Sequence, residues 1–213
     1  MKVGNPYRAI PSGNLGEMMD EGASLSLDGA SEAISGPGVH LLLGYHPRAN
    51  LSLAVDLCLR AVRRGGKALA IDCDRTIALE TERSRVGPDE VARILLSHPG
   101  DIPSLKSDVK AAASLQGMGI LLLNRASSLV GSTELLEKYG EKRSLWASLH
   151  PDLRSISLQA PVLVLEDARR YDQIEYKIHP ALYYLSDSIL DAVEEGKTVT
   201  GYRMVKRRLI RSP

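Results

Sequence analysis

The sequence predicts an α/β protein with a mostly parallel, twisted sheet and helices on both of its faces. Two short apolar runs, residues 39–43 and 68–71, flank a longer segment, residues 51–64, in which apolar residues recur at helical spacing. Gly65 and Gly66 end that segment. A strand, a helix and a second strand in this order indicate a βαβ unit, in which helices cover both faces of the parallel strands.

The same alternation continues along the chain. Apolar runs at residues 119–124 and 161–166 predict two further buried strands. Residues 188–193 and 198–209 predict a hairpin, because the polar turn 194–197 between them contains a glycine.

The remaining segments have weaker signals. An edge strand is expected over residues 24–29, followed by one helical turn over residues 30–34. Pro151 is expected to divide a long helix, because proline inside a helix removes a hydrogen-bond donor. The predicted helices cover residues 88–98, 104–115, 135–139 and 141–158.

Length and composition indicate one globular domain. The chain has 213 residues, of which 44% are hydrophobic and 25% charged, and its net charge of +1 gives no bulk attraction for a polyanion. We expect residues 34–213 to form the core domain and residues 1–33 to be an N-terminal arm or short lead-in.

Several classes of site and location are disfavoured. No apolar run approaches the ~20 residues of a membrane span, so we expect a cytoplasmic protein without a membrane partner. Cys58 and Cys73 lie in apolar elements and are expected to be free thiols. His40, His98 and His179 lack the spacing of metal ligands, so no metal is expected.

Three stretches carry a family resemblance: residues 36–44 (GPGVHLLLG), 63–72 (RRGGKALAID) and 179–190 (HPALYYLSDSIL). With the order of the predicted elements, they resemble the ATPase core of the RecA/RadA recombinase superfamily, a P-loop NTPase fold. The resemblance covers residues 34–211 approximately. It implies that the turn after residue 44 occupies the place of the family's phosphate-binding loop, G-x-x-x-x-G-K-[ST].

The loop departs from the family pattern at its chemically required positions. Gly44 matches the first glycine, and the four variable places hold Tyr45, His46, Pro47 and Arg48. Ala49, Asn50 and Leu51 then stand where the family has glycine, lysine and a hydroxyl residue. Pro47 has no N–H for a phosphate, and Leu51 has no oxygen for Mg²⁺.

A second magnesium position of the family is also altered. The resemblance places an aspartate at the end of the strand 119–124, where this chain has Asn124, followed by Arg125. Together these changes predict a pseudo-ATPase without cofactor. Glu166 and Asp167, at the end of the strand 161–166, further disfavour a triphosphate.

Two groups of charged residues have more than one interpretation. Asp72 and Asp74 follow a strand where the family often has an acid near the catalytic water, but without lysine and magnesium they are expected to be turn and cap residues. The C-terminal cations either protect an edge strand from unwanted pairing or form a DNA-contacting patch. These cations are Arg203, Lys206, Arg207, Arg208 and Arg211.

Three functions follow from these observations. The favoured one is a non-catalytic RecA/RadA-like paralogue that assists DNA recombination or repair by binding a recombinase-like subunit or a second copy of itself, with DNA as an additional partner. The second is an interaction subunit without a DNA role. The third is a nucleotide-binding protein with an unorthodox loop, in which Arg48 or a neighbouring lysine replaces the missing lysine.

Overall fold

The computed structural model describes residues 23–44, 49–77, 87–131, 135–167, 179–196 and 198–207. Its strands are β1 (Ser24–Leu25), β2 (Gly38–Gly44), β3 (Lys67–Asp72), β4 (Ile94–Ser97), β5 (Met118–Asn124), β6 (Pro161–Asp167), β7 (Ser188–Glu195) and β8 (Thr198–Arg207). Its helices are α1 (Leu27–Ala33), α2 (Leu51–Arg63), α4 (Pro88–Val91), α5 (Ile102–Ala113), α6 (Leu135–Ser157) and α7 (Pro180–Leu185), with a short 3-10 helix at Ala126–Leu129.

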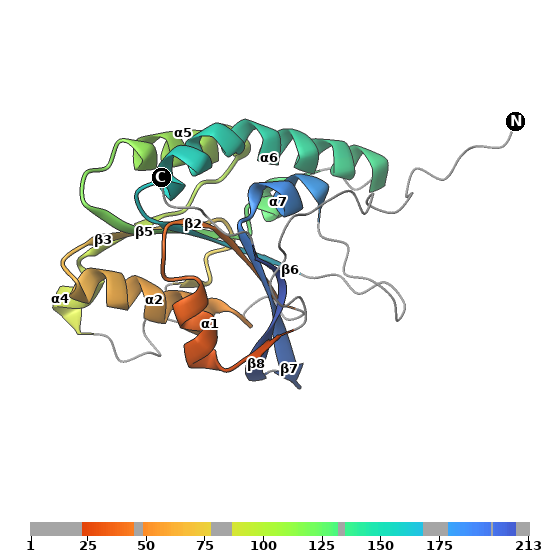
Figure 1. The fold of residues 1–213 in the computed structure, drawn as a ribbon. Helices are drawn as coiled ribbons and strands as arrows, with labels where there is room; N and C mark the ends of the chain where they lie inside the picture. The colour runs from red at the N-terminus through yellow and green to blue at the C-terminus, as the bar shows by residue number, and fades with distance from the viewer. Residues whose placement is uncertain are drawn as a thin grey trace, which may run out of the picture.

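Within the described residues the strands form one eight-stranded sheet in the order β1-β8-β7-β2-β6-β5-β3-β4. The strands from β7 to β4 in this order are parallel, whereas β8 and β1 are antiparallel to their neighbours. Helices α5, α6 and α7 lie on one face, and α1, α2 and α4 lie on the other (Figure 1). This arrangement confirms the predicted fold class, and the predicted hairpin is present as β7 and β8.

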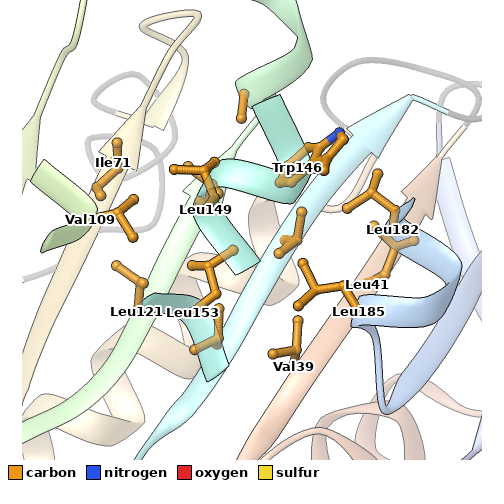
Figure 2. Packing of buried hydrophobic residues seen from close by; sticks show 14 of the residues in the cluster. Val39, Leu41, Ile71, Val109, Leu121, Trp146, Leu149, Leu153, Leu182 and Leu185 are labelled. Atoms are coloured by element: carbon orange, nitrogen blue, oxygen red, sulfur yellow. The ribbon is translucent and has the colours of Figure 1, made fainter. Parts of the chain in front are cut away.

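The alternation of side chains along β2 divides the core into two layers. Val39, Leu41 and Leu43 pack under α5, α6 and α7, whereas Leu42 packs with α1 and α2 on the opposite face. Figure 2 shows the first layer, where Trp146 and its neighbours on α6 project toward the strands. Trp146 is fully buried in this layer.

The segment predicted as a helix over residues 88–98 has a different structure. Only Pro88–Val91 is helical, and residues 94–97 form β4, which pairs in parallel with β3 from Ala68↔Ile94 to Ile71↔Ser97. The local apolar spacing suited a helix, but ladder hydrogen bonds to a strand distant in sequence decide the structure.

Proline does not divide α6, which runs without interruption from Leu135 to Ser157. Pro151 lies on the exposed side of the helix, while Leu149 and Leu153 on either side of it are buried in the same layer. Packing of the apolar stripe therefore outweighs the missing backbone hydrogen bond.

The expected lead-in is folded onto the sheet over its described part. The strand ends at Leu25, earlier than predicted, and helix α1 begins at Leu27, because Ser26 caps it by accepting a hydrogen bond from the Gly29 N–H at 3.1 Å. Ala30 and Ile34 are buried against α2 and β8.

Two further expectations concern thiols and membranes. Cys58 is buried and Cys73 half-buried, and both are free thiols, as predicted. Burial raises the pKa of each thiol to about 12, so both stay protonated at neutral pH. Among the described helices, none has the length and apolar character that a membrane crossing requires.

Leu153 and Leu158, near the end of α6, provide a test of the core layer between the sheet and α5, α6 and α7. Leu153 is 0% exposed and Leu158 is 82% exposed. We expect Leu153→Ala to lower the free energy of unfolding by about 2–5 kcal/mol, because the cavity it leaves cannot collapse fully. Leu158→Ala should change it by less than about 0.5 kcal/mol. Urea unfolding measures both, and equal effects would contradict the described packing.

Candidate functional site

The candidate site lies at the carboxyl ends of the parallel strands, where open α/β sheets bind ligands. Gly44, Asp72 and Asn124 end β2, β3 and β5, respectively. Asp72 and Asn124 are direct neighbours in the register of β3 and β5, whereas Gly44 is separated from them by β6. Most of the residues assigned by the resemblance therefore reach one edge of the sheet.

The two ends of the loop after β2 lie close together. A Cβ atom on Gly44 would be 2.8 Å from the Ala49 Cβ and 3.0 Å from the Asn50 Nδ2. A side chain at Gly44 is therefore excluded by sterics. Tyr45, His46, Pro47 and Arg48, the last with its considered nucleotide role, lie outside the described residues.

The positions of the family's lysine and hydroxyl residue are engaged elsewhere. Asn50 is 5% exposed, and its Oδ1 accepts a hydrogen bond of 2.9 Å from the phenol of Tyr202 on β8. Burial raises the pKa of Tyr202, so this phenol remains a donor. Leu51 is fully buried in the layer between the sheet and α2. Neither side chain is available to a phosphate or a cation.

Asn124 is the centre of a hydrogen-bonded cluster. Its Nδ2 lies 2.7 Å from Asp72 Oδ1, 2.7 Å from Asp74 Oδ1 and 3.0 Å from Thr76 Oγ1. Thr76 in turn donates to Asp74 at 2.7 Å. The amide of Asn124 therefore serves two carboxylates at once, which a carboxylate in its place could not do because it has no donor when ionised.

Arg125 completes the cluster from the first position after β5. Its Nη1 lies 2.7 Å from Asp74 Oδ2, and its own backbone is left-handed, with φ 51°. Burial opposes ionisation of Asp74, but hydrogen bonds from Arg125 and Thr76 outweigh it and hold the pKa of Asp74 below its usual range. Asp74 is thus a stable carboxylate with a fixed cationic partner.

The pKa of Asp72 is shifted upward, opposite to that of Asp74. Asp72 is fully buried, and burial raises its pKa, although the hydrogen bonds that it accepts from the Ile77 N–H and from Asn124 oppose this shift. His98, at the end of β4, lies beside it, with Nδ1 3.2 Å from the Asp72 carbonyl oxygen. Asp72 and Asp74 therefore differ in character because only Asp74 has a guanidinium against it.

The cluster does not fit a magnesium ion. An aspartate at position 124 would bring three carboxylates together and would require a cation, whereas asparagine brings a donor and satisfies two acids by itself. Arg125 supplies the remaining positive charge. Across the described part of the chain, no group of three or more His, Cys, Asp or Glu side chains could hold a metal ion.

The described C-terminal cations, Arg203 and Lys206, contact groups within the chain. Arg203 forms an ion pair of 2.8 Å with Asp191. Lys206 is 9% exposed, and its Nζ donates to the carbonyl oxygens of Tyr183 at 2.5 Å and Ser186 at 2.6 Å. These contacts fasten the end of α7 to β8. Arg208, Arg211 and the side chains of Arg207 and Asp167 lie outside the described residues.

Two participants, Tyr202 and Thr76, were missed from the sequence. Tyr202 contacts Asn50 although 152 positions separate them, and a local sequence pattern does not predict such a distant pair. Asp72 and Asp74 were expected to be turn and cap residues. Asp72 accepts from the Ile77 N–H and Asp74 lies in the turn after β3, and both also accept from the Asn124 amide. The signal that could have identified this cluster is the pair of acids at one strand end beside asparagine and arginine at the end of another.

Comparison with known proteins supports the fold. No protein-family model matches the chain, and no curated protein sequence matches it. The crystal structure of the RadB recombinase is similar, with a TM-score of 0.56, 15% sequence identity, and coverage of 82% of this chain and 83% of that chain. The chain therefore has the RecA-like α/β fold that its sequence resemblance implies.

The Arg125–Asp74 pair predicts a pH-dependent stability. Because the pKa of Asp74 is lower in the folded state than its unfolded value of about 3.9, the pair stabilises the protein above about pH 4 and loses its effect as the pH falls further. We expect Arg125→Gln to lower the free energy of unfolding by about 1–2 kcal/mol at pH 7, with the difference from wild type shrinking below pH ~4.

Arg125→Lys is the matched control, because it imposes a similar cost in the left-handed backbone while it keeps the positive charge. We expect it to retain more of the stability at pH 7 than Arg125→Gln does. Denaturant unfolding at several pH values measures both variants. A deficit for Arg125→Gln that is constant from pH 7 to pH 3 would contradict the assignment to Asp74.

Proposed function

We propose that this chain is a RecA-fold subunit without ATPase activity that assists DNA recombination or repair by binding another RecA-fold chain. The observation that carries the proposal is the engagement of the Asn124 amide and the Arg125 guanidinium with Asp72 and Asp74. This cluster satisfies internally the acids at the edge where a nucleotide-bound magnesium would require oxygen ligands.

The phosphate loop gives independent support for this proposal. Asn50 is neutral, short and bonded to Tyr202, and Leu51 belongs to the core. A nucleotide would therefore meet neither the point charge nor the hydroxyl that phosphate binding and magnesium binding use in this fold. The similarity to the RadB recombinase supports the fold and motivates the recombination role, which remains part of the proposal.

Protein binding is placed ahead of DNA binding because of how the described cations are used. Lys206 is bonded to two carbonyl oxygens of the chain itself, and Arg203 pairs with Asp191. A patch that recognises a phosphate backbone needs cations that release counterions to the nucleic acid. These two side chains are instead committed to internal contacts.

The edge strand β4 is the proposed contact surface. It is the last strand of the sheet, and within the described residues it pairs only with β3. Leu95 and Leu96 are 43% and 41% exposed, and no charged side chain lies within Ile94–Ser97. An apolar edge without charge is suited to adding a further strand. The occupant that we propose is an extended segment of another RecA-fold subunit.

Calorimetric titration with ATP and magnesium at low salt tests the absence of nucleotide chemistry. We expect no saturable heat at millimolar nucleotide, while an active recombinase core measured alongside should bind. The Arg48→Ala variant addresses the remaining alternative. A dissociation constant below about 100 µM, equivalent to roughly 5.5 kcal/mol, that is lost in this variant would replace the proposal with a nucleotide-binding function.

Charge substitution on β4 tests the contact surface. A second copy of this chain is the first partner to examine, by sedimentation velocity over a range of concentrations. We expect Leu96→Glu to abolish the concentration-dependent association of the wild type, because a charge on an edge strand blocks pairing. Leu158→Glu, at an exposed leucine remote from β4 in the sequence, should leave it unchanged.

If the wild type remains monomeric at every concentration, self-association is excluded, and recombinase subunits become the candidates for the same assay. If Leu158→Glu and Leu96→Glu have equal effects, the association is general hydrophobic adhesion and β4 is not the contact surface.

A further inference from the structure

A small pocket lies at the amino-terminal edge of the sheet, opposite the candidate site. Its volume is about 240 Å³, and its walls come from the end of α1, the second half of α2 and the first residues of the strands β5 and β6. Helices α1 and α2 are on the same face of the sheet (Figure 1). The pocket therefore shares no residue with the Asn124 cluster or with β4.

The floor of this pocket is apolar. Leu57 and Ile120 are buried in the layer under α2, and Ala61 and Pro161 complete the surface. The pocket volume is below the roughly 300–1,000 Å³ of common ligand pockets, so the pocket suits a small ligand with only a few carbon atoms. Because Leu57 and Ile120 are already largely out of water, a ligand there would gain mainly from removing its own apolar chain from water.

The rim carries two arginines that project to the same side of α2. Arg60 and Arg64 are one helical turn apart, which places them on the same face of the helix. Arg60 contacts Asp56 at 2.7 Å, but both side chains are more than two-fifths exposed, so this pair is weak and can be shared with a ligand. Arg64 makes no ion pair with any described residue.

The other charges at the rim limit the class of anion. Glu32 lines the same opening, and Asp56 partly neutralises Arg60. The two arginines and the two carboxylates therefore leave a net charge near zero at the rim, which excludes strong attraction of a multiply charged anion. This suits a singly charged carboxylate better than a doubly charged phosphate, and guanidinium groups match the planar carboxylate with paired hydrogen bonds.

We propose that this pocket binds a small monocarboxylic acid with a short apolar chain. The carboxylate lies between Arg60 and Arg64, and the chain lies on Leu57 and Ile120. The proposal goes beyond the function proposed above and does not depend on it, because its residues belong to the opposite edge of the sheet.

The experiment uses sodium acetate, propionate, butyrate and valerate as probes, with sodium chloride at equal ionic strength as the reference. Amide signals of α2 in NMR spectra follow each titration. We expect saturable binding that tightens about fourfold per added methylene until the pocket is full. Inorganic phosphate should bind more weakly than butyrate, and tighter binding of phosphate would overturn the assignment to a carboxylate.

Arg63 provides a matched control on the same helix. It is not part of the pocket, because its guanidinium pairs with Glu90 at 2.6 Å. We expect Arg64→Gln to weaken butyrate binding tenfold or more and Arg60→Gln to weaken it as well, whereas Arg63→Gln should leave the dissociation constant unchanged. Thermal unfolding of each variant verifies that it is folded.

Three further outcomes would overturn the proposal. The first is an affinity that does not depend on chain length. The second is an equal loss in Arg63→Gln and Arg64→Gln, which would indicate general attraction to the basic end of α2. The third is the absence of saturable shifts with every carboxylate in the series.

Discussion

The burial of strand β2 along its whole length is the constraint on which the rest of the structure depends. Every residue of Gly38–Gly44 is buried, and the strand pairs with β6 on one side and β7 on the other. Such a strand needs apolar cover on both faces and complete backbone pairing on both edges. The two helical layers provide the apolar cover. Backbone pairing is completed near the start of β2 by Asp187, whose carboxylate accepts a hydrogen bond of 2.9 Å from the Val39 N–H.

The edge at which β3 and β5 end carries acids whose partners come from within the chain. In a magnesium site the ion neutralises the charge of the clustered acids. Here the Asn124 amide donates hydrogen bonds to Asp72 and Asp74, and the Arg125 guanidinium pairs with Asp74. Asparagine has the shape of aspartate but carries donors. The acids at this edge are therefore hydrogen-bonded and paired within the chain without a metal ion.

The sequence predicted those parts of the structure that depend on local pattern. The apolar runs identified β2, β3, β5 and β6, since strands buried on both faces leave a continuous signal. It failed at β4, where a short run with helical spacing is held by ladder bonds to β3. It also failed at Pro151, where tertiary packing overrides a local preference.

For the site, Asn50, Leu51 and Asn124 could be identified from their positions in a pattern. Their partners could not, because the Tyr202–Asn50 contact joins distant segments and exists only once the sheet is assembled. The order of assembly follows from the same long-range pairing. Strand β2 pairs with β6 and β7, which lie within residues 161–195. During synthesis this apolar strand therefore stays unpaired until most of the domain has been translated. We therefore expect the nascent chain to depend on chaperones that shield exposed strands, and to depend on them more strongly than other chains of similar length.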